Sequence, residues 1–357
     1  MLNYRRRAVA VVPDIRHFSA LLLFLVGLVP LGGCEQRDYR RYQGSTMGTY
    51  YQVTARCPGD VREPIESELA GVNAEMSTYL EDSDLSRFNQ APVGSWVAVP
   101  ETLVQVVVAA LELSRESAGA FDVTVGPLVN LWGFGPGGHG PRGTQAAEAL
   151  PDPAQIEAMR QRVGYRFLEA RAQPPALRKS ADLYVDLSAI AKGHGVDRVV
   201  QRLLAAGCDA ALVDVGGEVR GVGSGPGGRP WRIGIEVPDP QRYGAIERII
   251  ELRDLAVATS GDYRNFIEIS GQRYSHTIDP RTGRPVSHAL ASVTVLHAST
   301  MWADGYATLL NVLGPEQGMA FARAHELAVL FLVRGANGFE ERYTAAFEAV
   351  LADRDDP

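Results

Sequence analysis

Short strand-like segments alternate with longer helix-like segments along this chain, and this alternation constrains its fold more than any other feature of the sequence. Apolar residues recur at every second position in the short segments and at every third or fourth position in the long ones. Helices are predicted at residues 61–76, 100–117, 189–206 and 301–313. Strands are predicted at residues 49–55, 184–187, 210–215, 231–237, 248–251, 266–269, 292–296 and 328–333. Such a mixture favours an α+β or mixed α/β fold.

Glycine, proline and serine mark where several of these elements should begin or end. Ser188 could cap the helix at 189–206, and Gly207 could close it. The pair Gly314-Pro315 should stop the helix at 301–313, and a hairpin turn is expected at Ser270-Gly271. The glycine-rich loops have neither the length nor the composition of an interdomain linker, so we expect a single domain.

The first 33 residues have the pattern of a bacterial export signal. Four arginines precede an apolar run at 20–30, which is too short to span a bilayer but suits the hydrophobic part of a signal peptide. The run ends in Leu31-Gly32-Gly33-Cys34, which resembles a lipobox, in which the cysteine is lipidated. The alternatives are an uncleaved anchor or a chance cysteine.

This pattern divides the chain into three predicted parts. Residues 1–33 are a lipoprotein signal peptide, residues 34–43 a tether and residues 44–350 the folded domain. Glu35 follows the lipidated cysteine, and we expect the protein to be lipid-anchored on the periplasmic side of the cell inner membrane.

Net charge and cysteine content limit which binding partners and which cysteine-based sites are expected. Cleavage after residue 33 would remove four Arg and one Asp, which changes the formal net charge from -7 to about -10. An acidic surface argues against nucleic acid as a partner. Besides Cys34 the chain contains Cys57 and Cys208. An oxidising compartment would permit one disulfide between them, but their spacing indicates no zinc site.

Reactive side chains gather with Gly and Pro in the segment from His276 to Pro285, whose sequence is HTIDPRTGRP. This composition suits a loop that holds a charged ligand better than it suits a core. Farther along, Asp304 and Thr308 lie four residues apart in a predicted helix. At that spacing both oxygens face the same way, as a hard cation requires, although such a pair can also be a solvated helix face.

These two segments complete a series of eight motifs that resembles a known family. In order they are Met47-Gly48-Thr49, Met76-Ser77-Thr78-Tyr79, Gly119-Ala120-Phe121-Asp122-Val123-Thr124 with Gly126-Pro127-Leu128 and Trp132-Gly133-Phe134-Gly135, Asp186-Leu187-Ser188-Ala189-Ile190-Ala191-Lys192-Gly193, Val215-Gly216-Gly217-Glu218, Thr259-Ser260-Gly261-Asp262-Tyr263-Arg264, the His276 segment, and Asp304-Gly305-Tyr306-Ala307-Thr308. The series is similar to the ApbE family of FAD:protein FMN transferases and covers residues 44 to about 333.

The resemblance implies a fold and a reaction. The fold would be the T-fold-like α+β architecture of that family, in a single catalytic domain with FAD in a cleft. The enzyme would use Mg²⁺ to move FMN from FAD onto a Thr or Ser hydroxyl of a partner flavoprotein, releasing AMP. The implied acceptors are subunits of the Na⁺-translocating NADH:quinone reductase or of Rnf complexes.

The resemblance also implies the site residues. The metal ligands would be Asp304, Thr308 and the main-chain carbonyl of Ala189. The contacts to FAD would be Met47, Tyr79, Ala120, Phe121, Asp122, Asp186, Lys192 and Thr277 or its neighbour Ile278. Taken alone, Tyr79 and Phe121 could as well be core residues. Lys192 could be an ordinary exposed lysine, but the chain contains only one other, Lys179.

His276 is the candidate general base, because an imidazole commonly accepts a hydroxyl proton. It could instead order its loop or contact the ligand, and Asp279 and Asp262 are competing bases. Two other functions stay open at this point: a metal-dependent FAD pyrophosphatase that makes FMN and AMP, and a lipoprotein that binds FAD without chemistry.

Overall fold

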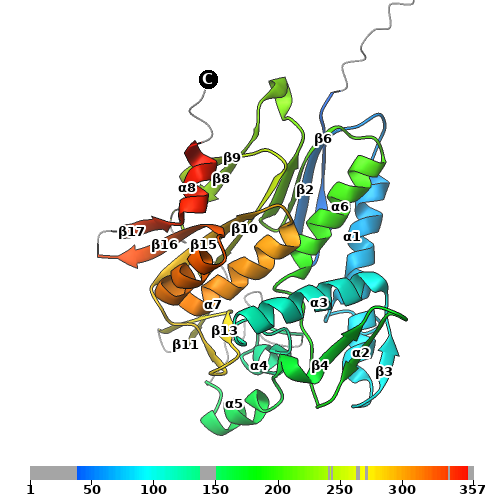
Figure 1. The fold of residues 1–357 in the computed structure, drawn as a ribbon, viewed down its shortest axis with the longest axis vertical. Helices are drawn as coiled ribbons and strands as arrows, with labels where there is room; N and C mark the ends of the chain where they lie inside the picture. The colour runs from blue at the N-terminus through cyan, green and yellow to red at the C-terminus, as the bar shows by residue number, and fades with distance from the viewer. Residues whose placement is uncertain are drawn as a thin grey trace, which may run out of the picture. The chain divides into compact units, whose positions relative to one another are not determined.

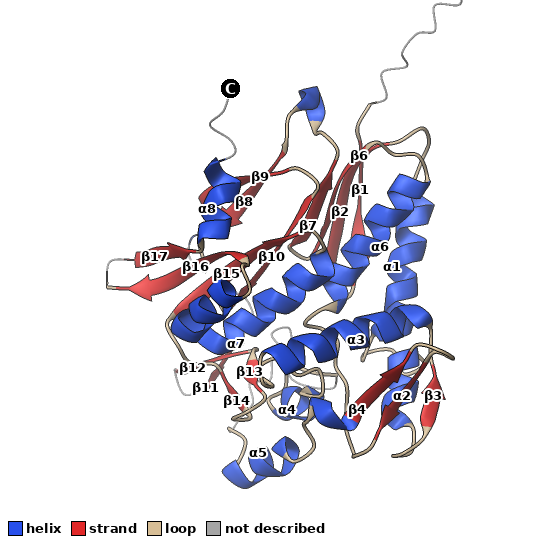
Figure 2. Ribbon diagram, in the orientation of Figure 1, coloured by secondary structure: helices blue, strands red, loops and turns tan. Residues whose placement is uncertain are grey.

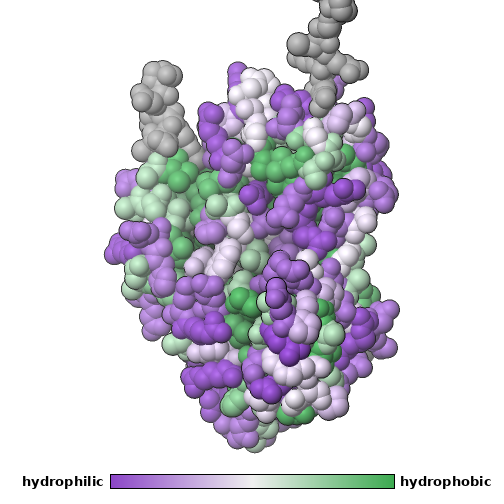
Figure 3. All heavy atoms as spheres, turned by 45° about the vertical axis from the view of Figure 1, so that its right-hand side comes forward, coloured by the Kyte–Doolittle hydropathy of each residue, from purple (hydrophilic) through white to green (hydrophobic). Residues whose placement is uncertain are grey.

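The computed structural model describes residues 38–136, 150–239, 242, 244–262, 266–269, 272–336 and 338–352. Cys34 and the predicted signal peptide lie outside these residues, as does the turn predicted at Ser270-Gly271. Within the described ranges, none of the helices combines the length and the apolar character needed to cross a bilayer. On the face shown in Figure 3, hydrophobic residues form separate patches between hydrophilic ones.

An eight-stranded antiparallel sheet forms the centre of the fold (Figure 1). In spatial order its strands are β1 (Arg40–Thr46), β2 (Thr49–Arg56), β6 (Ala210–Val215), β7 (Glu218–Val222), β10 (Leu255–Gly261), β15 (Leu290–His297), β16 (Ala328–Gly335) and β17 (Gly338–Tyr343). Side chains alternate between the two faces of each strand, so the sheet can support a separate core on each side.

Three long helices cover one face of this sheet, as Figure 2 shows. They are α1 (Arg62–Met76), α6 (Ala191–Ala205) and α7 (Thr300–Ala324), and a fourth long helix, α3 (Glu101–Glu116), packs against α7. Tyr51, Val53 and Ala55 of β2 point into this layer and are buried against α1 and α6. The helices bury apolar residues at helical spacing, which is why the sequence predicted them.

A hairpin and a short helix cover part of the opposite face. The hairpin consists of β8 (Trp231–Glu236) and β9 (Ile246–Leu252), and the helix is α8 (Ala345–Ala352). Trp231 and Phe347 pack there against apolar residues of the central sheet.

Smaller elements flank these layers. They are α2 (Asp84–Gln90), α4 (Gly126–Leu131), α5 (Pro153–Arg160), β3 (Trp96–Ala98), β4 (Leu168–Arg171), β5 (Ala176–Lys179), β11 (Phe266–Ile269), β12 (Gln272–Ser275), β13 (Ile278–Asp279), β14 (Arg284–Pro285) and the 3₁₀ helices Tyr165–Phe167 and Pro226–Gly228.

The structure confirms the predicted mixed α/β class and corrects two local predictions. Ser188 does not cap α6, because its hydroxyl donates to the carboxylate of Asp186 instead. The predicted strand at 184–187 is reduced to an isolated bridge between Tyr184 and Val125. The predicted stop at Gly314-Pro315 is confirmed, because Gly314 leaves helical geometry with φ 74° and ψ -177°; a second helical stretch of α7 follows this kink and ends at Ala324.

Cys57 and Cys208 form a disulfide across 151 residues of sequence. Cys57 follows β2, and Cys208 lies between α6 and β6. The bond therefore joins the sheet to the connection that follows the helix packed on it.

Candidate active site

One cavity of about 1760 Å³ contains most of the predicted site residues. It exceeds the roughly 300–1,000 Å³ of an ordinary ligand pocket, so a dinucleotide and a second reactant could share it. The predicted residues on its wall are Met47, Tyr79, Asp186, Ala189, Lys192, His276, Thr277, Ile278, Asp304 and Thr308. Asp304 and Lys192 lie in the first turns of α7 and α6, where helix dipoles favour an anion.

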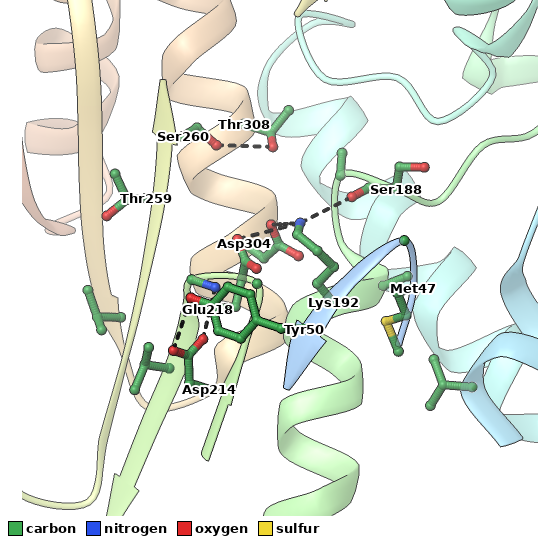
Figure 4. Close-up of a pocket in the computed structure, with 18 of the residues that line it drawn as sticks. Met47, Tyr50, Ser188, Lys192, Asp214, Glu218, Thr259, Ser260, Asp304 and Thr308 are labelled. Carbon is green, nitrogen blue, oxygen red and sulfur yellow. Dashed lines mark hydrogen bonds and ion pairs between the residues drawn. The ribbon is translucent and has the colours of Figure 1, made fainter. Parts of the chain in front are cut away.

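Lys192 lies between two buried carboxylates (Figure 4). Its Nζ is 3.4 Å from Oδ1 of Asp304 and 3.4 Å from Oε1 of Glu218. Burial alone would lower the pKa of Lys192, but attraction to Asp304 and Glu218 outweighs burial and raises it. Lys192 therefore stays charged beside the cavity and can attract a phosphate.

Asp304 is fixed by a close approach of two helices. Its Oδ2 accepts a 2.9 Å hydrogen bond from the main-chain N–H of Gly193 on α6. A Cβ at residue 193 would lie 2.2 Å from the carbonyl oxygen of Thr300 on α7, so a larger residue would push the helices apart. The glycine thus allows α6 and α7 to share the carboxylate.

Glu218 is a site residue to which sequence reasoning assigned no role. It begins β7 after the turn at Gly216-Gly217, and its Oε2 has no hydrogen-bond partner among the described residues. Burial raises the pKa of Glu218 to about 8; Lys192 opposes this shift and Asp304 adds to it. The sequence did place Glu218 in the Val215-Gly216-Gly217-Glu218 motif, which marked it as a candidate site residue. Its ion pair with Lys192 could not be predicted, because that contact depends on how β7 packs beside α6.

Asp304 and Thr308 supply oxygen atoms one turn apart on α7, as predicted. The hydroxyl of Thr308 lies 3.4 Å from that of Ser260, at the end of β10. The described residues contain no group of three or more His, Cys, Asp or Glu suited to a metal. One carboxylate, one hydroxyl and the nearby main chain of Ala189 suit Mg²⁺, which keeps several waters and takes phosphate oxygens as ligands.

The His276 loop is held to the same helix by its neighbour. Asn311 of α7 is fully buried and donates a 3.0 Å hydrogen bond from its side-chain amide to the hydroxyl of Thr277. Trp132 donates from its indole to the carbonyl of Gly283 at 2.9 Å, which secures the far end of the loop. Asp304, Thr308 and Asn311 are spaced along one side of α7, so this helix carries both the predicted metal ligands and the support for the predicted base.

The two competing bases are engaged elsewhere. Asp279 forms a two-point ion pair with Arg281, with distances of 3.0 and 2.9 Å. Asp262 forms a similar pair with Arg334. His276 lines the cavity, whereas neither of these aspartates does.

The remaining predicted FAD contacts fall into two groups. Tyr79 is 65% exposed on the cavity wall, so it is not a core residue, and its hydroxyl donates to the carbonyl of Phe134 at 3.3 Å. Ala120, Phe121 and Asp122 are buried and do not line the cavity. Their contact with FAD stays a prediction.

Met47 occupies the tip of the β1–β2 hairpin. It has a positive φ of 47° and is followed by Gly48 with φ 70°, the conformation of a tight type I′ turn. This backbone is uncommon for a residue with a side chain, and such positions concentrate at functional sites. Figure 4 shows Met47 at this turn, near the helix that carries Lys192.

Comparison with known proteins gives consistent results. The family described as "ApbE family" matches residues 47–331. An FAD:protein FMN transferase of Vibrio cholerae serotype O1 is 43% identical over 338 residues, covering 93% of this chain and 98% of the relative. The protein of that name from Escherichia coli K12 is 35% identical, covering 89% and 93%. The solved flavin transferase ApbE from Vibrio cholerae has a TM-score of 0.79 at 43% identity, covering 87% and 99%. The apo form of Pseudomonas stutzeri flavinyl transferase ApbE has a TM-score of 0.78 at 41% identity, covering 88% and 96%.

Proposed function

The chain belongs to the ApbE family, and from this premise we propose that it is an FAD:protein FMN transferase. The observation that carries the proposal is the position of Lys192, charged between Asp304 and Glu218, on the wall of a cavity that also holds His276. A pyrophosphate needs cationic and N–H groups, and a hydroxyl nucleophile needs a base. The site offers both within one cavity.

The reaction transfers a phosphoryl group between two oxygens. The acceptor hydroxyl attacks the phosphorus on the FMN side of the pyrophosphate, and a new phosphoester bond forms to FMN. The bond from that phosphorus to the bridging oxygen breaks, and AMP leaves with that oxygen. The hydroxyl proton passes to a base, for which we propose the imidazole of His276.

Lys192 and the first turn of α6 would hold the pyrophosphate and offset its charge. Asp304, Thr308 and the carbonyl of Ala189 would hold Mg²⁺. A bound Mg²⁺ supplies Lewis-acid stabilisation of phosphate oxygens. Asn311 would keep Thr277, and with it the neighbouring His276, at a fixed place relative to Asp304.

The acceptor and the location of the enzyme are proposals that rest on the family resemblance and on the sequence of the first residues. We propose exported or membrane flavoproteins of the Na⁺-translocating NADH:quinone reductase or Rnf type as acceptors. We also propose a lipid anchor at Cys34 on the periplasmic side of the inner membrane, supported by the lipobox-like Leu31-Gly32-Gly33-Cys34.

The deciding experiment incubates the mature enzyme with FAD, Mg²⁺ and a candidate acceptor subunit. The acceptor should gain the mass of one FMN, AMP should appear in equal amount, and EDTA should stop both. FMN and AMP without a modified acceptor would instead identify an FAD pyrophosphatase. FAD that binds and stays intact would identify a flavin-binding lipoprotein.

A further inference from the structure

The cavity continues beyond the predicted FAD contacts onto the other face of the sheet. Tyr50, Gln52 and Thr54 of β2 line it. Since side chains alternate along a strand, these three residues point away from the face that buries Tyr51 and Val53 under α1 and α6. We call this part of the cavity the outer arm, lined by Tyr50, Gln52, Thr54, Asp214 of β6 and strand β8. None of its residues is a predicted FAD contact.

Strand β8 presents one of its edges, rather than one of its faces, to the outer arm. All six of its residues, Trp231–Glu236, line the cavity, whereas a strand that presents one face contributes every second residue. Within the described ranges β8 pairs with β9 alone, and no residue of β9 lines the cavity. The edge of β8 that does not pair with β9 therefore faces the outer arm.

A free strand edge recognises an extended polypeptide. It presents main-chain N–H and C=O groups that a second strand can pair with, whatever the side chains of that strand. The five residues Trp231–Ile235 span roughly 17 Å, enough to hold a short segment in one register.

Packing and a hydrogen bond also hold strand β8 in place. Trp231 and Ile235 are buried in the core under the hairpin, and the indole of Trp231 donates to the carbonyl of Val222 at 3.0 Å. A strand fixed in this way loses little conformational freedom when it binds a partner.

The outer arm leads to the reaction centre. In Figure 4 the ring of Tyr50 and the carboxylate of Asp214 lie beside Glu218, which contacts Lys192. The hydroxyl of Tyr50 donates to Asp214 at 3.3 Å. A segment in the outer arm could therefore bring a side-chain hydroxyl to the pyrophosphate.

We propose that the acceptor protein binds with its hydroxyl-bearing segment as an extended strand over Trp231–Ile235, along the edge of β8 that does not pair with β9, in the outer arm. This inference rests on the proposed transferase function. Main-chain pairing would hold the segment, and a floor that combines the polar Gln52 and Thr54 with the apolar Leu212 would admit side chains of either kind.

The test uses bulky substitutions that fill the outer arm at residues that are not predicted FAD contacts. Thr54→Trp should raise the KM for a subunit of the Na⁺-translocating NADH:quinone reductase by about ten-fold or more, while the KM for FAD changes by less than about two-fold. Gln52→Trp is a second variant with the same expectation. Glu247→Trp is the matched control, because Glu247 is exposed on β9 and does not line the cavity; it should behave as the wild type.

Hydrogen exchange gives a readout that needs no catalysis. Main-chain amides of β8 should exchange more slowly when the same subunit is added to the wild type, and those of β17, the far edge of the sheet, should not change. Normal acceptor KM in both Trp variants, or unslowed exchange in β8, would overturn the inference. A KM for FAD that rises with the acceptor KM would assign the outer arm to FAD instead. Hydrolysis of FAD by the wild type without a modified acceptor would refute the proposed function, and β8 exchange would still decide the docking edge.

Discussion

The two walls of the cavity are built differently. On the helix wall, α6 and α7 meet at Gly193, and Asp304, Lys192 and Glu218 are in contact with one another or with main-chain N–H groups. On the loop wall, His276 belongs to a segment of short two-residue strands and turns, tied to α7 through Thr277.

This difference matches two demands of the proposed reaction. A pyrophosphate has the same charge in every reaction cycle, so the groups that bind it gain from being fixed in advance. The acceptor is a protein that must enter and leave, and the bonds through Thr277 and Gly283 keep the proposed base in place on the wall that meets its hydroxyl.

The largest effect is expected on the helix wall. Asp304→Ala removes the proposed charged metal ligand and the partner of Gly193, so FMN transfer should fall by roughly a thousand-fold or more, because metal catalysis contributes several kcal/mol. Circular dichroism should show an intact fold, and raised Mg²⁺ should restore part of the activity. Full transfer by this variant would show that Asp304 is not a metal ligand.

On the loop wall, His276→Ala should lower the rate of transfer by roughly a hundred- to a thousand-fold with little change in FAD affinity, as loss of a general base does. Asp279→Asn is the matched control in the same loop and should be nearly neutral, because Arg281 already engages that carboxylate. If the His276 variant binds FAD poorly but turns over normally at saturation, His276 is a ligand contact.

Glu218→Gln tests the buried carboxyl group of the helix wall through stability. The pKa of Glu218 is raised from 4.5 to about 8, so its folded form holds a proton that the unfolded chain has lost. The resulting stability is present below 4.5 and is lost as the pH rises toward about 8. In metal-free buffer the free energy of unfolding of the wild type should fall with pH across this window more than that of Glu218→Gln, by on the order of 2 kcal/mol. Parallel urea-denaturation profiles for the two proteins would show that Glu218 is ionised throughout.

The smallest effect is expected at the link between the walls. Asn311→Ala removes the hydrogen bond to Thr277, so kcat should fall by roughly three- to ten-fold while the KM for FAD stays constant. Thr277→Val breaks the same bond from the other side, and the double variant should be no slower than the slower single variant. Additive losses would mean that the two residues act independently.

The sequence predicted elements that local patterns specify and missed contacts that depend on packing. The spacing of Asp304 and Thr308 placed them correctly on one helix face, since helical geometry alone determines it. The Glu218–Lys192 ion pair could not be derived in this way, because it joins the start of β7 to the start of α6. The Asn311–Thr277 hydrogen bond depends in the same way on where the loop packs against α7.

The wrong prediction of a Ser188 cap has a local cause. Asp186 lies two residues before Ser188 and accepts its hydroxyl, so this hydroxyl is not available to cap α6. The predicted stop at Gly314-Pro315 is confirmed by the kink at Gly314, but the helical stretch that follows it was not predicted. In that stretch Ala322 is buried in the main core and Gly318 lies against Phe331, contacts that depend on tertiary packing.

The contact between Lys192 and Asp304 has a consequence for how the substrates assemble. One carboxylate is shared by an ammonium group and, in the proposed reaction, by Mg²⁺. A cation that occupies Asp304 would release Lys192 toward the pyrophosphate, and so would increase the affinity for FAD. By thermodynamic reciprocity FAD must then increase the affinity for the cation by the same factor. Mg²⁺ and FAD would therefore load as a pair, and the supply of either one would set the apparent affinity for the other.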